Sequence, residues 1–245
     1  MKQAYVIGRN PVVEALQANK PLEKILISKT ANGDVIKKII QLAKEKDVFC
    51  QFVPDVKIDS LSKANHQGVL GILSLVQYYD LQDIVNIAYD KGEDPLILVL
   101  DSITDVRNFG AIARSALGLN VHGVVIPKKG SVTIQEDAIK VSAGALLHLP
   151  VCRAENLAVA VKDLKNNGLK AIGLDGTAKE YIHRNDLKMP LALVLGSEGE
   201  GISAPVKKLL DRTVKLPMND QLESYNVSVA NAMALYEVWR QRAIS

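Results

Sequence analysis

The sequence predicts an α/β protein with a small N-terminal domain and a larger domain built on a parallel sheet. Short apolar runs rich in β-branched residues alternate with amphipathic segments along the chain, which is typical of strands joined by helices. In the second half, several strand-like runs are apolar at every position. Such strands are buried on both faces of a parallel sheet, so helices are expected on both sides of it.

The first domain is predicted to alternate strands and helices. Asn10 followed by Pro11 is typical of a helix start, and Asp34 is expected to cap a second helix. Strands are expected at 24–28, 48–53 and 69–76.

The second domain shows a clearer alternation. Strands are expected at 96–101, 121–127, 170–175, 191–196 and 213–217. Helices are expected at 109–119, 134–144, 155–167, 203–210 and 226–243. The runs LILVLD and LALVLG resemble each other and are interpreted as two central strands. Ligands of open α/β sheets bind beyond the carboxyl ends of such strands, so the loops that follow them are the candidate site.

The formal net charge of +3 is unevenly distributed along the 245 residues. Residues 1–77 hold 11 Lys and Arg against 7 Asp and Glu, residues 78–94 hold 1 against 5, and residues 95–245 hold 18 against 15. We therefore predict a first domain at 1–77, an acidic linker at 78–94 with a short helix over 81–90, and a second domain at 95–245. Two mildly basic domains permit an RNA partner without requiring one.

Composition excludes several classes of protein. With 48% hydrophobic residues, the chain can fill a sizeable core and is not intrinsically disordered. The longest apolar runs in strand-like segments have about five residues, whereas a membrane span needs roughly 20. No signal peptide is expected at the N-terminus. Cys50 and Cys152 lie in apolar strand-like runs, so we expect free buried thiols and a cytoplasmic location.

Common catalytic motifs are missing from the sequence. It contains no G-x-G-x-x-G after a strand, no G-x-x-x-x-G-K-[ST] and no G-x-S-x-G, which argues against a dinucleotide site, a P-loop and a serine hydrolase. The four histidines are scattered away from both cysteines, so no metal site is expected.

Three segments remain as candidates for chemistry. In the first, at 100–119, Asn108 lies where it can cap a helix, and Arg114 is either a solvated side chain or a group that binds phosphate or polarises a hydroxyl. In the second, at 191–203, three glycines are interleaved with Glu198 and Glu200. This segment is either an ordinary turn or a loop for a ligand with amines, hydroxyls or positive charge.

The third segment, at 215–242, joins a strand to a long C-terminal helix. Ser224, Asn226 and Ser228 crowd the helix start, although one capping residue would suffice. On the helix, small residues form a stripe that allows close packing, either within the chain or against a second subunit. The stripe includes Val227, Ala230 and Ala234.

Together the three segments resemble the signature motifs of the SpoU (TrmH) family of RNA ribose 2′-O-methyltransferases, in the order NFGAIARSA, LGSEGEG and LPMNDQLESYNVSVANA. The first domain resembles the family's substrate-binding domain through YVIGRNPVVEAL and NHQGV. The two-domain arrangement is most similar to members that methylate a guanosine ribose in large-subunit (23S) rRNA. Tyr225 departs from the leucine that is usual in the third motif.

The resemblance implies a homodimeric enzyme of the SPOUT superfamily, with a C-terminal trefoil knot and S-adenosylmethionine as its cofactor. It places Arg114 and the cofactor pocket close to the dimer interface. The catalytic residues it implies are Asn108, Arg114, Glu198, Ser224 and Asn226, with Glu198 available to orient Arg114. The cofactor-binding residues it implies are Gly196, Leu216, Met218 and Tyr225.

RNA contacts are expected in the first domain, where polar residues flank the first helix and the last strand. The candidates are Arg9, Asn10, His66 and Gln67. Three alternatives stay open: a methyltransferase acting on tRNA rather than rRNA, an RNA-binding or ribosome-assembly protein without methylation activity, and an unrelated α/β enzyme with convergent glycine-rich loops.

Overall fold

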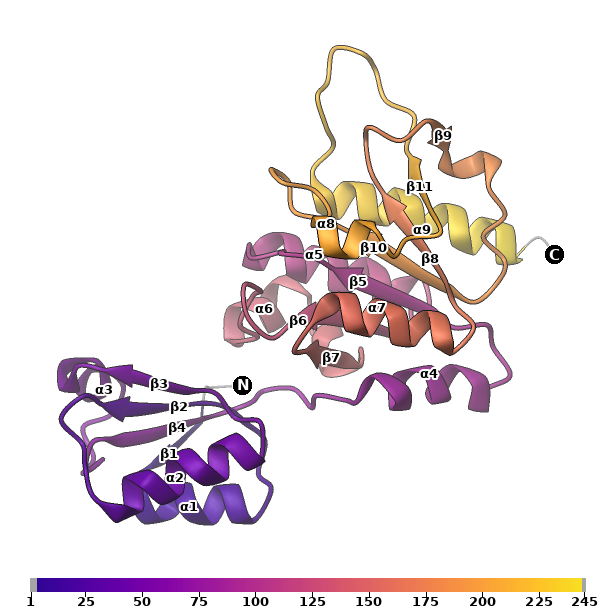
Figure 1. Ribbon diagram of the computed structural model, residues 1–245. Helices are drawn as coiled ribbons and strands as arrows, with labels where there is room; N and C mark the ends of the chain where they lie inside the picture. Colours follow the sequence, from indigo (N-terminus) through magenta and orange to yellow (C-terminus); the bar gives the residue numbers. More distant parts are fainter. Residues whose placement is uncertain (1–3, 244–245) are drawn as a thin grey trace. The chain divides into compact units, whose positions relative to one another are not determined.

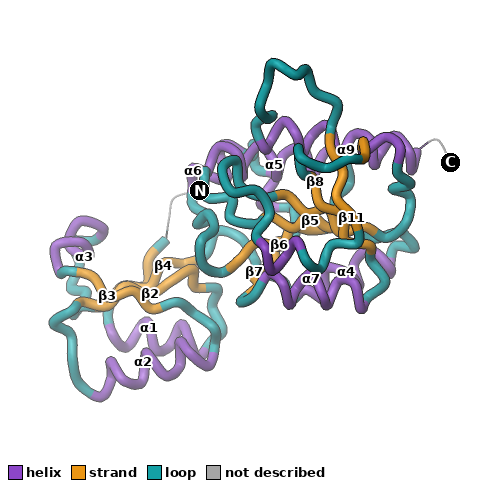
Figure 2. Tube along the Cα trace, turned by 45° about the horizontal axis from the view of Figure 1, so that its top comes forward, coloured by secondary structure: helices purple, strands orange, loops and turns teal. Residues whose placement is uncertain are grey.

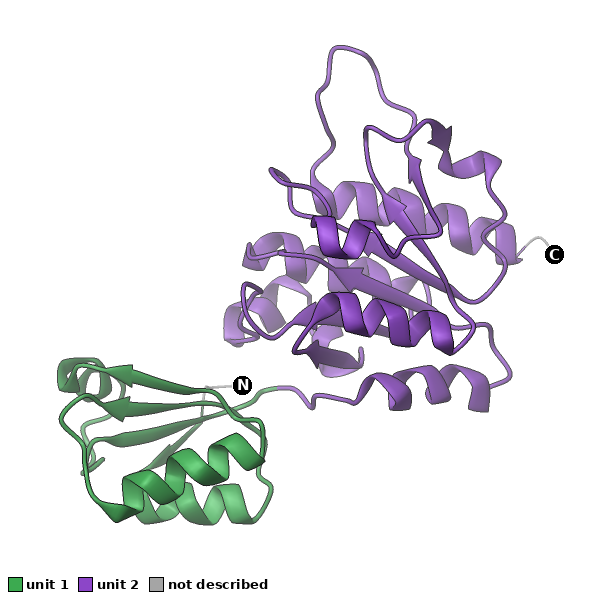
Figure 3. Ribbon diagram, viewed as in Figure 1, with its two compact units in different colours: residues 1–75 green, residues 76–245 purple. Residues whose placement is uncertain are grey.

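The structure, a computed structural model, describes residues 4–243. The chain divides into two compact units, residues 1–75 and residues 76–245 (Figure 3). Each unit has its own sheet and its own buried core. The first unit carries the sequence features of the expected substrate-binding domain, and the second contains all three candidate segments.

Unit 1 is a four-stranded sheet with helices on both faces (Figures 1 and 2). The strand order is β1-β4-β2-β3, in which only the β2–β3 pair is parallel. Helices α1 and α2 bury their apolar sides against one face, and the short α3 covers the other. The elements are β1 (Tyr5–Ile7), α1 (Arg9–Gln17), β2 (Leu22–Ser28), α2 (Asp34–Glu45), β3 (Cys50–Val53), α3 (Asp55–Leu61) and β4 (Val69–Leu73).

Unit 2 is built on a seven-stranded parallel sheet with the order β7-β6-β5-β10-β8-β11-β9. The strands are β5 (Leu96–Leu100), β6 (Gly123–Pro127), β7 (Val151–Ala154), β8 (Lys170–Leu174), β9 (Glu180–Tyr181), β10 (Leu191–Leu195) and β11 (Arg212–Lys215). The predicted central pair is confirmed, because β5 and β10 run side by side in register and every residue of both is buried.

Helices cover both faces of this sheet, as the wholly apolar strands predicted (Figure 2). One face packs against α5 (Val106–Gly118), α6 (Glu136–Val141) and α9 (Val227–Ala243). The other packs against α4 (Leu81–Asp90), α7 (Leu157–Asn166) and α8 (Ala204–Lys207). Short 3₁₀ helices lie at η1 (Ala145–Leu147) and η2 (Ile182–Arg184).

The acidic segment 78–94 differs from the expected linker, because it is part of unit 2. Its helix α4 buries Ile84 and Val85 in the core of that unit. A side chain at Gly123 of β6 would lie 2.4 Å from Cγ2 of Ile84, so the helix and the strand approach closely. All five acidic residues of this segment are exposed, on α4 or beside its ends, and charge pattern alone does not distinguish such a helix from a linker.

Helix starts also differ from the sequence expectation in a consistent way. Gly8 and Gly33, both with positive φ, precede α1 and α2, so Asn10 and Asp34 lie within the first turn rather than at the cap. At α5 the cap is Asp105, whose Oδ1 accepts a hydrogen bond of 2.8 Å from the backbone N–H of Asn108. Asn108 therefore lies within the first turn of α5 and does not cap this helix.

Both cysteines are free, as predicted. Cys152 is buried, and burial followed by the nearby charge of Asp80 raises the pKa of its thiol to about 11. Cys50 is only half-buried, contrary to the expectation. No helix within residues 4–243 combines the length and apolar character needed to cross a lipid bilayer.

Candidate active site

The candidate site forms where β5 and β10 end. The backbone N–H of Asp101 donates to the carbonyl of Leu195 at 2.8 Å, which extends the pairing of the two strands by one residue. Oδ2 of the buried Asp101 accepts a hydrogen bond of 2.8 Å from the backbone N–H of Ser203. The carboxylate that ends β5 therefore fixes the far end of the loop that follows β10.

That loop, residues 196–202, is called here the glycine loop. It closes on itself through two hydrogen bonds between Ser197 and Gly201, of 3.2 and 3.1 Å. The closure brings the backbone of Gly201 so near Gly196 that a Cβ on Gly196 would lie 2.0 Å from the carbonyl carbon of Gly201. Glycine is therefore required at 196 by the fold of the loop itself, whatever binds beside it.

A second loop, residues 217–226, joins β11 to α9 and projects from the unit in Figure 1. It is called here the projecting loop. The hydroxyl of Tyr225 donates to the carbonyl of Pro217 at 3.1 Å, which fastens the two ends of this loop together. A leucine at position 225 could not make this contact, so the departure from the usual family residue has a structural consequence.

A cavity of about 700 Å³ lies between the glycine loop and the projecting loop. The four residues predicted to bind the cofactor, Gly196, Leu216, Met218 and Tyr225, all line it. Of the predicted catalytic residues, Glu198 and Ser224 also line it. The loops that the sequence identified separately therefore surround one space.

Three predicted catalytic side chains meet beside this cavity. Oε1 of Glu198 accepts hydrogen bonds from Nδ2 of Asn108 at 3.0 Å and from Nδ2 of Asn226 at 2.6 Å. Nδ2 of Asn226 also donates to Oδ1 of Asn108 at 2.9 Å. The half-buried Asn108 and the exposed Glu198 and Asn226 thus close a triangle between the start of α5, the glycine loop and the start of α9.

Asn226 also caps α9. Its Oδ1 accepts from the backbone N–H of Ser228 at 3.0 Å and from the hydroxyl of Ser228 at 2.6 Å. The backbone N–H of Val227 lies 3.4 Å from Oε1 of Glu198 and donates to it. The carboxylate of Glu198 therefore lies at a helix N-terminus, where negative charge is favoured.

Arg114 and Ser224 stand apart from the triangle. Arg114 is exposed on α5, does not line the cavity, and has no hydrogen bond or ion pair within residues 4–243. The expectation that Glu198 orients Arg114 is therefore not met, because Glu198 is engaged by the two asparagines. Ser224 is exposed at the cavity wall, and within the described residues its hydroxyl has no partner.

Two of the RNA-contact candidates, Arg9 and Asn10, begin α1, and the other two, His66 and Gln67, lie on the loop before β4. Arg9 donates from Nε to the carbonyl of Gln67 at 2.9 Å and from Nη1 to the carbonyl of Asn32 at 3.1 Å, so it ties the start of α1 to two loops. His66 accepts at Nδ1 from the N–H of Gly68 at 3.0 Å. Because Nδ1 accepts, the ring proton is on Nε2, which donates to Oδ1 of Asp59 at 2.9 Å.

Arg9 and His66 therefore shape these loops. The side chains of Asn10 and Gln67 belong to exposed residues, and Gln67 adopts a positive φ of 50°. A residue forced into this conformation is held there by its surroundings, here by the contact of its carbonyl with Arg9.

Sequence reasoning missed two carboxylates that matter to the site, Asp101 and Asp175. Asp175 lines the cavity and binds Lys207 at 2.6 Å. Burial opposes its ionisation, but hydrogen bonds from Lys207 and Thr177 outweigh this and lower the pKa of the carboxyl below its ordinary value. Both residues directly follow buried strands, and an aspartate in that position is the signal that could have identified them.

Comparison with known proteins agrees with this geometry. The profile of the SpoU rRNA methylase family matches residues 95–236, and that of the RNA 2′-O ribose methyltransferase substrate-binding domain matches residues 5–79. The chain belongs to the SpoU family. It is therefore an RNA methyltransferase, as the motifs predicted, and the family depends on S-adenosylmethionine.

Relatives of this SpoU family member share its whole length. It is 39% identical to YacO of Bacillus subtilis, named as a TrmH family tRNA/rRNA methyltransferase, over 97% of this chain and 96% of that protein. A Staphylococcus saprophyticus protein of the same description is 38% identical, over 99% of this chain and 97% of that protein.

Solved structures of the SpoU family share the fold. The AdoMet complex of the methyltransferase AviRb from Streptomyces viridochromogenes superposes with a TM-score of 0.64 at 23% identity, over 99% of this chain and 92% of that chain. An AdoMet-bound rRNA methyltransferase from Sinorhizobium meliloti gives a TM-score of 0.62 at 19% identity, over 98% and 87%. Across residues 4–243, no cluster of His, Cys, Asp and Glu side chains is arranged to hold a metal ion.

Proposed function

We propose that this chain transfers the methyl group of S-adenosylmethionine to a ribose 2′-hydroxyl in RNA, with a guanosine of large-subunit rRNA as the preferred substrate. The observation that carries the proposal is the triangle of Asn108, Glu198 and Asn226 beside a cavity lined by the four predicted cofactor residues. Residues from three separate motifs converge in this triangle, and the second and third motifs also line the cavity.

The cavity suits this cofactor in size and charge. Its volume of about 700 Å³ lies within the usual range for small-molecule sites, roughly 300–1,000 Å³. Its carboxylates, which favour a ligand carrying sulfonium and ammonium charges, outnumber its ammonium groups. The carboxylates are Asp175, Glu198, Glu200, Asp220 and Glu223, against Lys207 and Lys215.

When bound, the cofactor supplies a methyl group on a sulfonium that is already a good leaving group. The remaining task of the protein is to align the ribose hydroxyl with that methyl, and positioning of this kind accounts for large rate effects. Glu198, Asn108 and Asn226 fix the glycine loop against two helix starts and so hold the cavity in one shape. Ser224 offers an unpaired hydroxyl at the cavity wall for the ribose.

Arg114 acts on the RNA side of the reaction in this proposal. An arginine has a pKa above about 12 and does not serve readily as a base, so we assign it to the phosphate next to the reacting ribose and to charge that develops on the hydroxyl oxygen. Its exposed guanidinium, free of ion pairs within residues 4–243, fits that role. As the ribose oxygen bonds to the methyl carbon and the methyl–sulfur bond breaks, the hydroxyl proton passes to solvent water.

We assign Arg114 to the cavity of a second copy in a homodimer, because within one chain it does not line the cavity of about 700 Å³. The expected stripe on α9 does not supply the interface, because Val227 and Ala234 are buried in the core of their own unit. A different face of α9 exposes apolar side chains instead: Val229, Tyr236 and Trp239 are 47%, 55% and 42% exposed. We assign this face to contact with the second copy.

Sedimentation of the wild type and of Trp239→Glu tests this interface. We expect a dimeric wild type and a monomeric variant, and a monomeric wild type would contradict the assignment.

Unit 1 is assigned to RNA recognition through the loops that Arg9 joins. The separate test is a truncated chain of residues 76–245, since α4 belongs to the core of unit 2 and has to be retained. We expect it to bind S-adenosylmethionine and to lose most RNA affinity. Equal methylation by the truncated and full chains would remove unit 1 from recognition. The trefoil knot implied by the resemblance and the cytoplasmic location expected from the two cysteines stay predictions.

The deciding experiment compares RNA substrates. Purified protein is incubated with methyl-labelled S-adenosylmethionine and either 23S rRNA or total tRNA, and ribose methylation is located by its resistance to alkaline hydrolysis. We expect one guanosine of 23S rRNA to be labelled. Labelled tRNA alone would favour the tRNA alternative, and absence of cofactor binding in calorimetry would favour the inactive RNA-binding protein.

The matched control is the pair Glu198→Gln and Glu198→Ala. A glutamine carbonyl can still accept from both asparagines, whereas alanine leaves their amide groups without it. We expect alanine to lose activity far more severely than glutamine. Equal losses would show that charge rather than the triangle governs this position.

A further inference from the structure

A basic and aromatic surface lies on the second unit, next to the cavity. It consists of Tyr181, His183, Arg184, Lys188 and Lys215, and is called here the Tyr181 surface. Tyr181 and Lys215 also line the cavity, so the two are continuous. None of these residues belongs to the three signature motifs.

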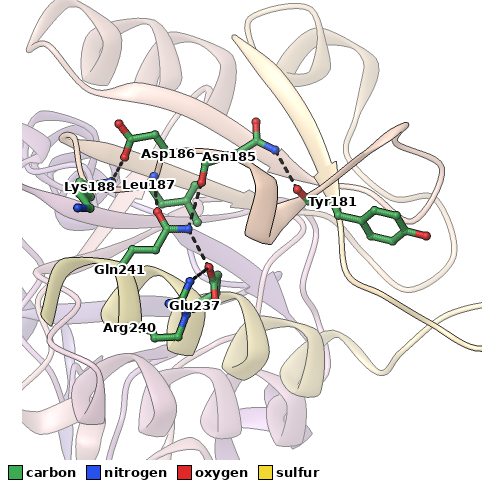
Figure 4. Close-up of polar contacts among 8 residues, drawn as sticks. All are labelled: Tyr181, Asn185, Asp186, Leu187, Lys188, Glu237, Arg240 and Gln241. Atoms are coloured by element: carbon green, nitrogen blue, oxygen red, sulfur yellow. Dashed lines mark hydrogen bonds and ion pairs between the residues drawn. The ribbon is translucent and has the colours of Figure 1, made fainter. Parts of the chain in front are cut away.

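The backbone beneath this surface is firmly anchored (Figure 4). The side chain of Gln241 on α9 donates to the carbonyl of Asn185 at 3.1 Å and accepts from the N–H of Leu187 at 2.9 Å. The buried Asn185 donates to the carbonyl of Tyr181 at 2.9 Å and accepts from Arg212 at 2.8 Å. Leu187 is fully buried, so the exposed side chains project from a segment fixed on two sides.

The rings and the cations of this surface are arranged together. The rings of Tyr181 and His183 stack with centroids 5.5 Å apart and planes 19° apart. Cζ of Arg184 lies 5.6 Å and Nζ of Lys215 lies 5.1 Å from the centroid of the Tyr181 ring. In Figure 4 the Tyr181 ring points away from the anchoring cluster.

The positive charges are largely uncompensated. Arg184, Lys188 and Lys215 form no ion pair within residues 4–243. Of the nearby carboxylates, Glu237 is engaged by Arg240 through hydrogen bonds of 2.9 and 2.8 Å, and Asp186 accepts from the N–H of Lys188 at 3.0 Å. Glu180 is exposed on β9. An anionic ligand on this side therefore meets more cations than carboxylates.

A hollow of about 500 Å³ extends the surface away from the cavity. It is lined by side chains from η2, from the segment that follows it and from the end of α9, among them His183, Arg184, Lys188 and Arg240. Cations beside stacked rings are the combination that binds single-stranded nucleic acid, because phosphates meet the cations and bases stack on the rings. An acidic protein would pair with the cations but would leave the stacked rings of Tyr181 and His183 without a partner.

We propose that the Tyr181 surface binds single-stranded RNA next to the nucleotide that is methylated. One base stacks on the Tyr181–His183 pair, and the flanking phosphates contact Arg184, Lys188 and Lys215. The continuity with the cavity carries the strand past the reacting ribose. This inference rests on the proposed function, since it assigns a second contact for the same substrate.

The test uses the full chain and two variants, Arg184→Ala/Lys188→Ala and His183→Ala. For the double variant we expect the KM for RNA to rise at least fivefold, while kcat and the Kd for S-adenosylmethionine stay within twofold of wild type. The slope of log affinity against log salt should fall by about 0.7 for each phosphate that the protein no longer neutralises. His183→Ala should raise the KM at least threefold without changing that slope. Lys162→Ala is the matched control, an exposed lysine of α7 on the opposite face of the sheet, and should change nothing.

Three outcomes would overturn the proposal. An unchanged KM and salt slope in the double variant would show that RNA does not touch this surface. An equal rise in the KM for RNA in Lys162→Ala would show that the effect follows the net charge of the protein and not this surface. Altered sedimentation with an unaltered KM would assign the surface to contact between copies of the chain. Binding of single-stranded RNA is measured as well, so that a wild type without methylation activity refutes the proposed function while leaving this inference testable.

Discussion

Replacing Gly196 by alanine tests the link between the glycine loop and cofactor binding. The added Cβ would lie 2.0 Å from the carbonyl carbon of Gly201 and 2.3 Å from the backbone nitrogen of Ile202. Carbon atoms in contact prefer about 3.5 Å, so the two backbones have to separate by roughly 1.5 Å. The hydrogen bonds of 3.2 and 3.1 Å between Ser197 and Gly201 do not survive such a shift.

The magnitude follows from these two effects. Overpacking costs about 1–3 kcal/mol and each broken hydrogen bond about 1 kcal/mol. These costs destabilise the native conformation of the loop, so we expect it to adopt another one. Because Gly196 and Glu198 line the cavity, we expect Gly196→Ala to weaken S-adenosylmethionine at least tenfold, or about 1.4 kcal/mol. Isothermal calorimetry measures the affinity, and urea unfolding measures whether the domain stays folded.

The same loop provides its own controls. Gly199 has nothing within 4 Å of an added Cβ, so Gly199→Ala should leave the affinity within twofold of wild type. Gly201 has equal space but a φ of +67°, where an L-residue costs about 1–2 kcal/mol, so its alanine variant should be intermediate. Wild-type affinity in Gly196→Ala, or equal losses in Gly196→Ala and Gly199→Ala, would refute the reasoning.

Three further predictions concern other parts of the chain. Arg114→Ala should abolish methyl transfer with the cofactor Kd nearly intact, and Arg114→Lys should also be poor because an ammonium lacks the planar fork; a lysine variant with a near-normal rate would contradict this. Arg242 donates to backbone carbonyls just before β5 and β10 at 2.7, 3.4 and 2.8 Å, and Arg242→Ala should lower the unfolding free energy by about 2–4 kcal/mol in urea; a loss below about 1 kcal/mol would show that water replaces it. The hydrogen bond from Arg240 lowers the pKa of Glu237, so this carboxylate stabilises the folded state above the ordinary pKa of about 4.3 and stops doing so as the pH falls through its lower folded pKa. The difference in unfolding free energy between wild type and Glu237→Gln should therefore be larger at pH 6 than at pH 3, and a difference independent of pH would contradict the assignment.

Much of the fold follows from the sequence because the strongest signals are the buried ones. The runs LILVL and LALVL are apolar throughout, and the structure pairs them residue for residue as the centre of the sheet. Four elements were not predicted: β1, α3, β7 and β9 are too short or too polar to give a periodic pattern. The acidic segment was predicted to be a linker, but Ile84 and Val85 pack into the core of unit 2, and Glu93 lies 2.8 Å from the buried His122.

The sequence motifs predicted the loops that surround the cavity, but not the contacts between their side chains. Motif residues identify which loops meet, whereas the partner of each side chain depends on geometry that has no periodic signature. Glu198 illustrates this: the sequence suggested a guanidinium partner, and the structure provides two amide groups. Gly196 illustrates it again, because the demand for glycine comes from the backbone of Gly201 and not directly from a ligand.

The contacts of Glu198 also explain why its three motifs depend on one another. A single carboxylate oxygen accepts from Asn108, Asn226 and the N–H of Val227, which lie 90, 28 and 29 residues away along the chain. Asn108 donates to Glu198 from the first turn of α5, whose cap is Asp105, and Asn226 both donates to Glu198 and caps α9. A change in any one of these residues therefore alters two helix starts and the glycine loop together. Since the glycine loop and the projecting loop enclose the same cavity, a side chain that contacts only protein still affects whatever the cavity holds.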